Sequence, residues 1–193
     1  MRPVYGGIDF GTSNSTVGVI ENGRPRLVAL EGDEVTLPSA IFFNFEDNGT
    51  YFGRQAIGQY ADAVEGRLMR ALKSVLGSSL VHEKTRLKAR QIAFTDIIGM
   101  FVGHLKQKLD SHAGENVEAV HPGCHPRTER GDAAVGMIRD LLRSVGGAVR
   151  RPDFGVGKEL AQIVAALRRR HRNREDLAHL GEGDAGLGEQ AVL

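Results

Sequence analysis

The segment at residues 7–15 constrains the fold of this chain more than any other part of its sequence. The apolar run at residues 4–10 predicts a short strand, and the Gly-Thr-Ser-Asn cluster that follows it is typical of a turn. Residues 16–20 are rich in β-branched side chains and predict a second strand. The order of strand, turn and strand distinguishes this segment from a Walker A loop and from the Rossmann glycine motif, because both of those lead into a helix.

The turn has the chemistry of a phosphate site. Gly11 has no Cβ, so the backbone can approach a ligand closely. The N–H groups of the turn can form a nest that binds an anion, and hydroxyl and amide donors are added by Thr12, Ser13 and Asn14. Asp9 ends the first strand, and an aspartate beside a phosphate needs an intervening cation, usually Mg²⁺ with its water shell. The alternative for this segment alone is a plain β-hairpin whose residues serve only turn geometry.

Composition and charge narrow the class of protein. The chain has 193 residues, of which 41% are hydrophobic and 25% charged, as in an ordinary globular domain. Its formal net charge of +1 argues against a nucleic-acid partner and against a membrane surface. The single cysteine, Cys124, leaves no partner for an intrachain disulfide, and no stretch has the apolar length of a secretory signal or membrane span. We therefore expect a cytoplasmic location.

The first 120 residues predict a meander of hairpins followed by helices. An Asn-Gly pair at residues 22–23 is a hairpin signal. The expected elements are strands at 26–30, 38–45 and 50–52 and helices at 55–64 and 95–109. Apolar side chains at three-and-four spacing between Leu68 and Leu76 predict another helix or turn. Residues 117–120 predict a buried strand, which we expect to stop there because two prolines follow in residues 121–126.

The sequence changes character after residue 120. Phe154 is the only aromatic residue beyond this point and Lys158 the only lysine, whereas arginine and glycine are frequent. A segment with so few large apolar side chains has little surface to bury, which predicts a poorly structured tail at 121–193. Residues 135–142 and 160–170 nevertheless keep a helical pattern. One hypothesis for the change is that the coding sequence is read off-frame from this point.

The histidines and the basic run do not predict further sites. His121, Cys124 and His125 lack a fourth ligand at a spacing that suits a metal. The arginine-rich run at 168–174 has no interleaved aromatic residue and is followed by two acidic ones, which favours a solvated segment over a nucleic-acid site. The remaining histidines of the first half are predicted to lie at the surface, and they are His82, His104 and His112.

Four segments together resemble the actin-like ATPase domain of the heat-shock protein 70 family. The first phosphate loop of that family is similar to Gly-Ile-Asp-Phe-Gly-Thr-Ser-Asn-Ser at residues 7–15, and its Pro-Ser strand is similar to Leu-Pro-Ser-Ala-Ile-Phe-Phe at 37–43. Its Gly-x-x-Ala segment resembles residues 51–56, and the stretch with its catalytic lysine resembles residues 71–77. The order and spacing of all four agree. Asn14, where the family usually has an aromatic residue, indicates a divergent bacterial branch.

The resemblance implies an α/β fold, the N-terminal part of an actin-like (ribonuclease H-like) ATPase domain with a mixed sheet. This incomplete first lobe would occupy residues 1–120, and the C-terminal segment at 121–193 would be poorly structured or helical. Asp9 would hold Mg²⁺ through water, and Lys73 would approach the γ-phosphate and position the attacking water. The β- and γ-phosphates of ATP would be contacted by Gly11, Thr12, Ser13 and Asn14.

Two classes of function stay open at this point. The family supplies a second Asp-Gly-Gly-Gly-Thr loop and an adenosine pocket from a second lobe, and neither is present in this sequence. One class is a chaperone-like ATPase, impaired by that loss, whose partners would be ATP and an unfolded client protein. The other is a non-enzymatic remnant or interaction fragment without ATPase activity. Neither class includes a nucleic-acid or membrane partner.

Overall fold

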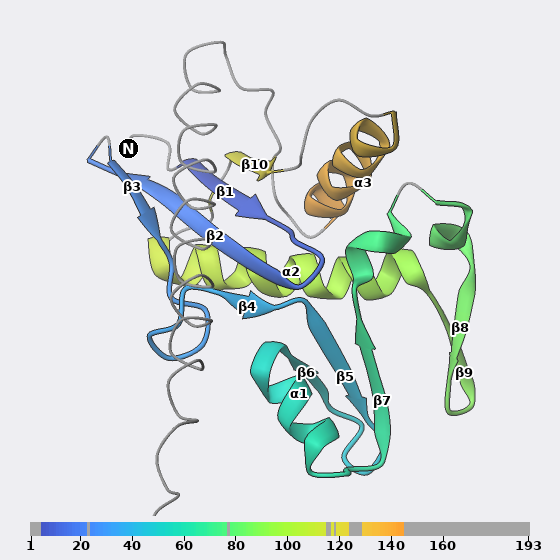
Figure 1. The fold of residues 1–193 in the computed structure, drawn as a ribbon. Coiled ribbons are helices and arrows are strands. Elements are labelled where there is room, and N and C mark those ends of the chain that lie inside the picture. The colour runs from blue at the N-terminus through green and yellow to red at the C-terminus, as the bar shows by residue number, and fades with distance from the viewer. Residues whose placement is uncertain are drawn as a thin grey trace, which may run out of the picture.

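The computed structural model describes residues 5–22, 24–76, 78–114, 117, 119–123 and 129–144. Within them the chain forms a mixed sheet, a three-stranded antiparallel sheet, a separate hairpin and three α-helices (Figure 1). Cys124, His125 and the arginine-rich run lie outside the described residues. None of the described helices has the length and apolar character needed to span a membrane.

The mixed sheet contains the predicted hairpin. Its strand order is β10-β1-β2-β3, and β4 pairs with the start of β2. The strands are β1 (Tyr5–Asp9), β2 (Asn14–Glu21), β3 (Arg24–Leu27), β4 (Leu37–Pro38) and β10 (Ala119–Gly123). Asn22 has a φ of 52°, the left-handed conformation that an Asn-Gly hairpin turn requires, so that prediction is confirmed. The returning strand β3 begins and ends earlier than the predicted 26–30.

Strand β10 overturns the prediction that the chain leaves the sheet at residue 120. It pairs in parallel with β1 as far as Gly123, with Pro122 opposite Ile8. The prolines argued only against a central strand, whereas β10 is the last strand in the order of the described sheet. An edge strand tolerates proline, because the missing N–H can face the side on which no strand pairs.

The three-stranded sheet has β5 (Ala40–Asn44) between β6 (Thr50–Phe52) and β7 (Gly66–Arg70). All five residues of β5 are buried, and successive side chains point to opposite faces. Ile41 and Phe43 join the main core of the molecule, whereas Ala40 and Phe42 join a small second cluster with Ala56 of helix α1 (Gly53–Ala61). The helix was predicted at 55–64; it begins two residues earlier, at Gly53, and ends three residues earlier, at Ala61.

The predicted helix or turn between Leu68 and Leu76 is wrong for its first part. Leu68 and Met69 lie in β7, where they are paired with Phe42 and Ile41 and point to opposite faces. Only Leu72–Val75 is helical, as the 3-10 helix η1, and a second 3-10 helix, η2, spans Ser79–His82. A short apolar run has no unique period, and pairing with β5 satisfies the backbone of β7 better than one isolated turn would.

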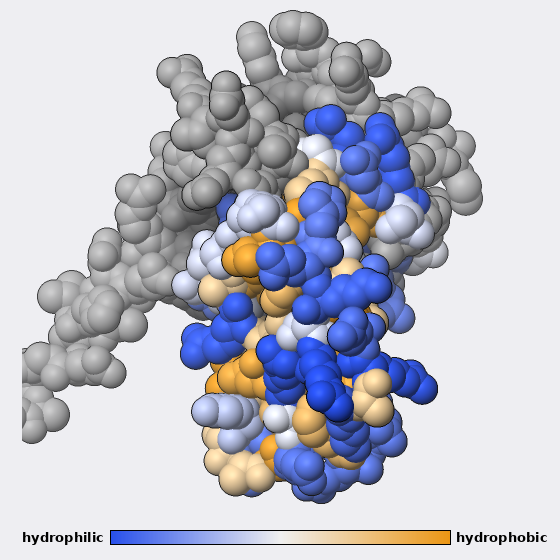
Figure 2. All heavy atoms as spheres, turned by 90° about the vertical axis from the view of Figure 1, so that its right-hand side faces the viewer, coloured by the Kyte–Doolittle hydropathy of each residue, from blue (hydrophilic) through white to orange (hydrophobic). Residues whose placement is uncertain are grey.

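A hairpin that was not expected from the sequence follows. It is formed by β8 (Lys84–Leu87) and β9 (Arg90–Ala93). Its outer side chains are exposed and basic, among them Lys84, Arg86 and Lys88. The face of the molecule seen in Figure 2 is accordingly hydrophilic over most of its described surface.

Helix α2 (Phe94–Ala113) contributes a whole face of buried side chains to the main core. It extends the predicted helix at 95–109 by one residue at the start and four at the end, and Gly114, with φ 70°, ends it in the left-handed conformation. Six apolar side chains on one face are fully buried, and they are Ile97, Ile98, Phe101, Val102, Leu105 and Leu109. Helix α3 (Glu129–Ser144) packs against α2 and adds Ile138 and Leu142 to the same core, so the helical pattern predicted at 135–142 is confirmed.

Two polar residues of α2 are less exposed than polar residues on a surface helix normally are. His104 was predicted to lie at the surface, but its ring stacks on Phe52 with centroids 4.2 Å apart and planes 9° apart. Lys106 is 2% exposed and donates to Asp110, one turn later, at 2.6 Å. The ring of Phe52 and the packing of the mixed sheet on α2 bury positions that helical spacing alone assigns to the rim.

Candidate phosphate-binding site

The residues with phosphate-site chemistry lie between β1 and β2. We call residues 11–14 the phosphate turn. Phe10, just before it, is fully buried and its ring centroid is 5.6 Å from that of Phe101 on α2. Thr12 and Ser13 are exposed. The turn is therefore anchored in the core at its start, while its hydroxyl groups face solvent.

Gly11 is required by the turn itself. A Cβ placed on Gly11 would lie 2.1 Å from the carbonyl oxygen of Asn14, a distance that no real side chain tolerates. From the sequence alone, this glycine is expected to allow close approach of a ligand. The nearer constraint is the backbone of its own turn, which folds back on Gly11.

A contact that the sequence did not predict holds the turn through the carbonyls of Gly11 and Ser13. Ser39, between β4 and β5, donates its N–H to the carbonyl of Ser13 and its Oγ–H to the carbonyl of Gly11, both at 2.8 Å. Its Oγ also lies 2.8 Å from Oγ of Ser15. The only signal in the sequence was the Pro-Ser pair at residues 38–39, to which the resemblance assigned no role.

Asp9 lies at the carboxyl end of β1, between Thr16 of β2 and Gly123 of β10. Its side chain is half-buried. Among the described residues, no three His, Cys, Asp or Glu side chains gather as a metal site.

Lys73 lies on a different element from the phosphate turn. It is half-buried in η1, which follows Ala71, a non-glycine residue with a φ of 54°. The 3-10 helix packs on α2, and α2 also contacts β1 and β2. One helix therefore supports both the turn and the segment that carries Lys73.

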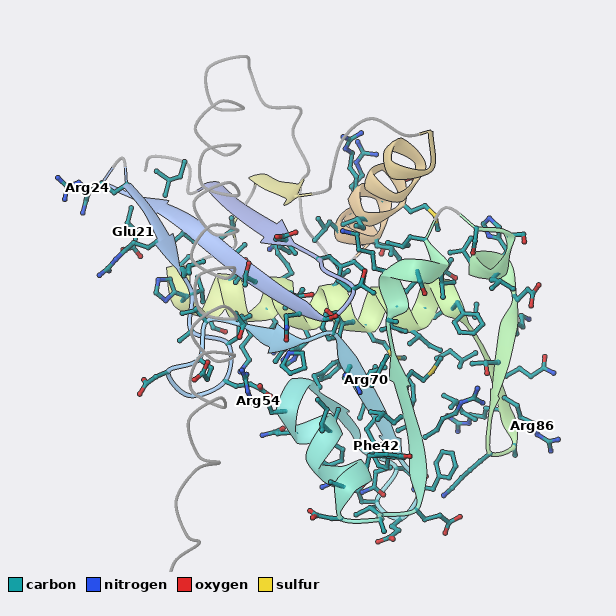
Figure 3. The ribbon with its side chains drawn as sticks, in the orientation of Figure 1. Glu21, Arg24, Phe42, Arg54, Arg70 and Arg86 are labelled. Carbon is teal, nitrogen blue, oxygen red and sulfur yellow. The ribbon has the colours of Figure 1, made fainter. Side chains whose placement is uncertain are left out.

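The far end of the β1–β2–β3 sheet is held by charged side chains. Glu21, labelled in Figure 3, accepts from Arg26 at 2.9 Å and lies 3.0 Å from Nε2 of His112 at the end of α2. The hydrogen bond from Arg26, followed by that from His112, lowers the pKa of Glu21 below its ordinary value. These exposed pairs orient the sheet end on α2 more than they stabilise it.

The loop before β4 is tied to helix α1. Arg54, near the start of that helix in Figure 3, donates to Glu31 at 2.8 Å and to the carbonyl of Thr36 at 2.7 Å. The carboxylate of Glu31 also accepts the backbone N–H of Arg54 at 2.9 Å. The loop that leads into β4 is thus attached to the first turn of α1.

The sequence of this chain matches the model of a known protein family. A family model described as Hsp70 protein matches residues 5–120, which is more than half of the chain. The chain belongs to the Hsp70 family. Its mixed α/β fold is accordingly that of the N-terminal part of an actin-like ATPase domain, and the family is one of chaperone-type ATPases.

A curated relative agrees with this placement. The chain is 29% identical over 112 residues to the chaperone protein DnaK of Metamycoplasma hominis. The matched region covers 58% of this chain and 18% of that protein. The chain therefore spans less than a fifth of the length of this relative.

Proposed function

We propose that this Hsp70-family chain forms one phosphate-binding face of an ATP site. The observation that carries the proposal is the phosphate turn, whose backbone is held by the core and by Ser39 while the hydroxyl groups of Thr12 and Ser13 stay exposed. Backbone N–H groups fixed in this way bind anions without having to reorganise.

The roles of the individual residues follow from their chemistry. Asp9 would hold Mg²⁺ through water, and the metal would neutralise charge on the phosphates. The β- and γ-phosphates would be bound by Gly11, Thr12, Ser13 and Asn14. Lys73 would place its ammonium group near the γ-phosphate and orient the attacking water, so hydrolysis would proceed by positioning and charge neutralisation. A client protein and a cytoplasmic location belong to the same proposal.

The second candidate is an interaction module that does not hydrolyse ATP. It is favoured by the extent of the family match, which ends at residue 120 although the chain continues beyond it. A nucleotide that is gripped by one face alone binds weakly. At a ligand concentration equal to Kd, binding stabilises a protein by only about 0.4 kcal/mol.

Amide NMR of the full chain with Mg·ATP tests the site, because it detects millimolar binding. We expect the amide signals of the phosphate turn to move as Mg·ATP is added, with little or no shift in Tm. Asp9→Asn should reduce the Mg²⁺-dependent part of the change, whereas Asp33→Asn, on an exposed loop, should not. Signals that stay in place at the turn would overturn the proposal, and a Tm shift of several degrees would show a more complete site.

A steady-state ATPase assay separates the two candidate functions. The wild type is compared with Asp9→Asn and Lys73→Ala, and Lys84→Ala on exposed β8 serves as the matched lysine control. Hydrolysis above background that is lost in the first two variants and kept in the control supports the enzyme. Equal background hydrolysis in all four supports the interaction module.

The division of the chain at residue 120 is also a proposal. Residues 1–120 would be the ATPase part and residues 121–193 a segment of different origin, although α3 already packs on α2. Translation of the coding DNA in its other two frames past codon 120 tests the off-frame hypothesis. A second Asp-Gly-Gly-Gly-Thr loop in one of them is the expected result, and its absence from both contradicts the hypothesis.

A further inference from the structure

Ser39 occupies the junction between the two sheets. It follows Pro38, the last residue of β4, and precedes Ala40, the first residue of β5. Its side chain is buried, with 2% of the residue exposed. A buried hydroxyl group stays in a folded protein only when its hydrogen-bonding capacity is used, so its partners define its role.

The direction of each hydrogen bond can be assigned. The single proton of the Ser39 hydroxyl is donated to the carbonyl of Gly11. In the contact between Oγ of Ser39 and Oγ of Ser15, Ser15 must therefore be the donor. The result is a directed chain from Ser15 through Ser39 to the backbone of the phosphate turn, in which each bond polarises the next.

These linked hydrogen bonds determine which way the peptide groups of the turn face. All peptide bonds of the described residues are trans, and in a trans peptide the carbonyl of one residue and the N–H of the next point in opposite directions. The carbonyls of Gly11 and Ser13 both point to Ser39. The N–H groups of Thr12 and Asn14 therefore both point away from it.

Strand β4 contributes to the same orientation. Pro38 lies opposite Asn14 and has no N–H to donate. The bond between the strands is made one residue later, from the N–H of Ser39 to the carbonyl of Ser13. Asn14 is thus left with its N–H directed away from β4, on the ligand side of the turn.

We propose that Ser39 is a positioning residue for phosphate binding, which turns two carbonyls of the phosphate turn inward and so aligns two N–H donors outward. The inference rests on the proposed function of the turn. It assigns the Pro-Ser pair a role in the site without any contact to the nucleotide. Loss of the hydroxyl frees the carbonyl of Gly11 and lets the peptide between Gly11 and Thr12 rotate.

The test uses the full ¹⁵N-labelled chain and four proteins. Ser39→Ala removes the hydroxyl, and Ser39→Thr restores one at the same position. Ser144→Ala on α3 is the matched control, because it breaks a bond of the same kind, from a serine Oγ to the carbonyl of Leu141 at 2.7 Å. For each protein the amide spectrum is recorded without ligand and during titration with Mg·ATP, and the free energy of unfolding is measured in urea.

We expect Ser39→Ala to weaken Mg·ATP binding at the turn by roughly tenfold, the order of one lost hydrogen bond and its consequences. The amide signals of Thr12 and Asn14 should move in this variant before ligand is added. Ser39→Thr should bind as the wild type does, within about twofold, as should Ser144→Ala. Unchanged affinity in Ser39→Ala, or equally weak binding in Ser39→Thr, would overturn the inference.

The same spectra separate this inference from the function on which it rests. Failure of the proposed function appears as a wild-type turn that does not respond to Mg·ATP. If Ser39→Ala then still moves the free signals of the turn, the serine is an element of the fold alone, and its role in phosphate positioning is overturned. A responsive wild type with an unaffected Ser39→Ala contradicts only the inference about Ser39.

Discussion

The two sheets of the molecule differ in how much core supports them. The mixed sheet with the phosphate turn rests on α2 and α3 and shares the main core, which includes Phe10, Phe101 and Leu142. The three-stranded sheet packs its other face on α1, and the buried hydrophobic residues of that small cluster are Ala40, Phe42 and Ala56; Phe42 is labelled in Figure 3. The proposed site lies on the better supported sheet, where backbone donors can be held in place.

Strand β5 connects the two regions through its two-residue period. Its apolar side chains alternate between the main core and the small cluster, so two of its five residues serve each. The consequence is asymmetric. The three-stranded sheet depends on the main core through β5, whereas the β1–β2 hairpin is connected to the region of the small cluster through Ser39 and through the contacts of Arg54.

The largest expected effect is that of Phe101→Ala. Phe101 is fully buried and its ring lies 5.6 Å from Phe10 and 6.2 Å from Phe52, so the substitution leaves a cavity between the two regions. We expect a loss of about 3–5 kcal/mol in the free energy of unfolding, measured in urea.

Phe42→Ala is its matched partner in the small cluster. Hydrogen exchange should show selective loss of protection in α1 and β6 for Phe42→Ala and loss throughout the described fold for Phe101→Ala. If Phe42→Ala lowers the protection of the β1–β2 hairpin as much as that of α1 and β6, the asymmetry between the regions does not exist.

Gly11→Ala should have the next largest effect. The added methyl group collides with the carbonyl oxygen of Asn14 and forces the turn open, at a cost of roughly 1–3 kcal/mol. Gly58→Ala in α1 is the control, because nothing lies within 4 Å of its Cβ and a helical alanine stabilises by about 0.5–1 kcal/mol. Thermal unfolding of both variants measures the difference, and a destabilised Gly58→Ala would show that α1 is packed differently.

Arg54→Ala weakens the connection between the regions. The variant loses the contacts to Glu31 and Thr36, and we expect about 1 kcal/mol because the arginine side chain is 44% exposed and its ion pair is screened. Arg26→Ala, whose ion pair with Glu21 is more exposed, should have a clearly smaller effect. Equal effects in 1 M salt and low salt would assign the Arg54 contribution to its neutral hydrogen bonds.

The smallest effect is a dependence of stability on pH through His104. Burial, and then the charge of Lys108, lower the pKa of His104 below its ordinary value of 6.5, against the opposing effect of Glu31. As pH falls, the unfolded chain therefore binds a proton at His104 before the folded chain does. The contribution of neutral His104 to the free energy of unfolding is complete above pH 6.5 and is lost as pH falls through the lower pKa of the folded state.

His104→Gln should flatten the urea stability curve just below pH 6.5 and leave its acid limb unchanged. The acid limb belongs to carboxylates such as Glu21 and Asp47, whose lowered pKa values act below about pH 4.5. A slope that persists in the variant would place the titrating group elsewhere.

Local signals in the sequence predicted the elements that depend on neighbours in the chain. The β1–β2 hairpin, the Asn-Gly turn at residue 22 and helix α2 were all expected, because turn chemistry and a long helical period act within a few residues. Strand β7 and the end of β10 were not, since strand pairing with β5 and β1 is a contact between distant segments. The roles of Asp9 and Lys73 stay predictions.

The sequence by itself determined that residues 7–15 form a turn between two strands and that the chain is of the Hsp70 type, because turn chemistry and the order of four motifs are properties of the chain alone. Only the tertiary structure decided what holds that turn. Ser39 is 28 residues from Gly11 in sequence, and its hydroxyl reaches the turn because β4 pairs with β2. A hydrogen bond between residues so far apart depends on the register of two strands, which no local pattern encodes.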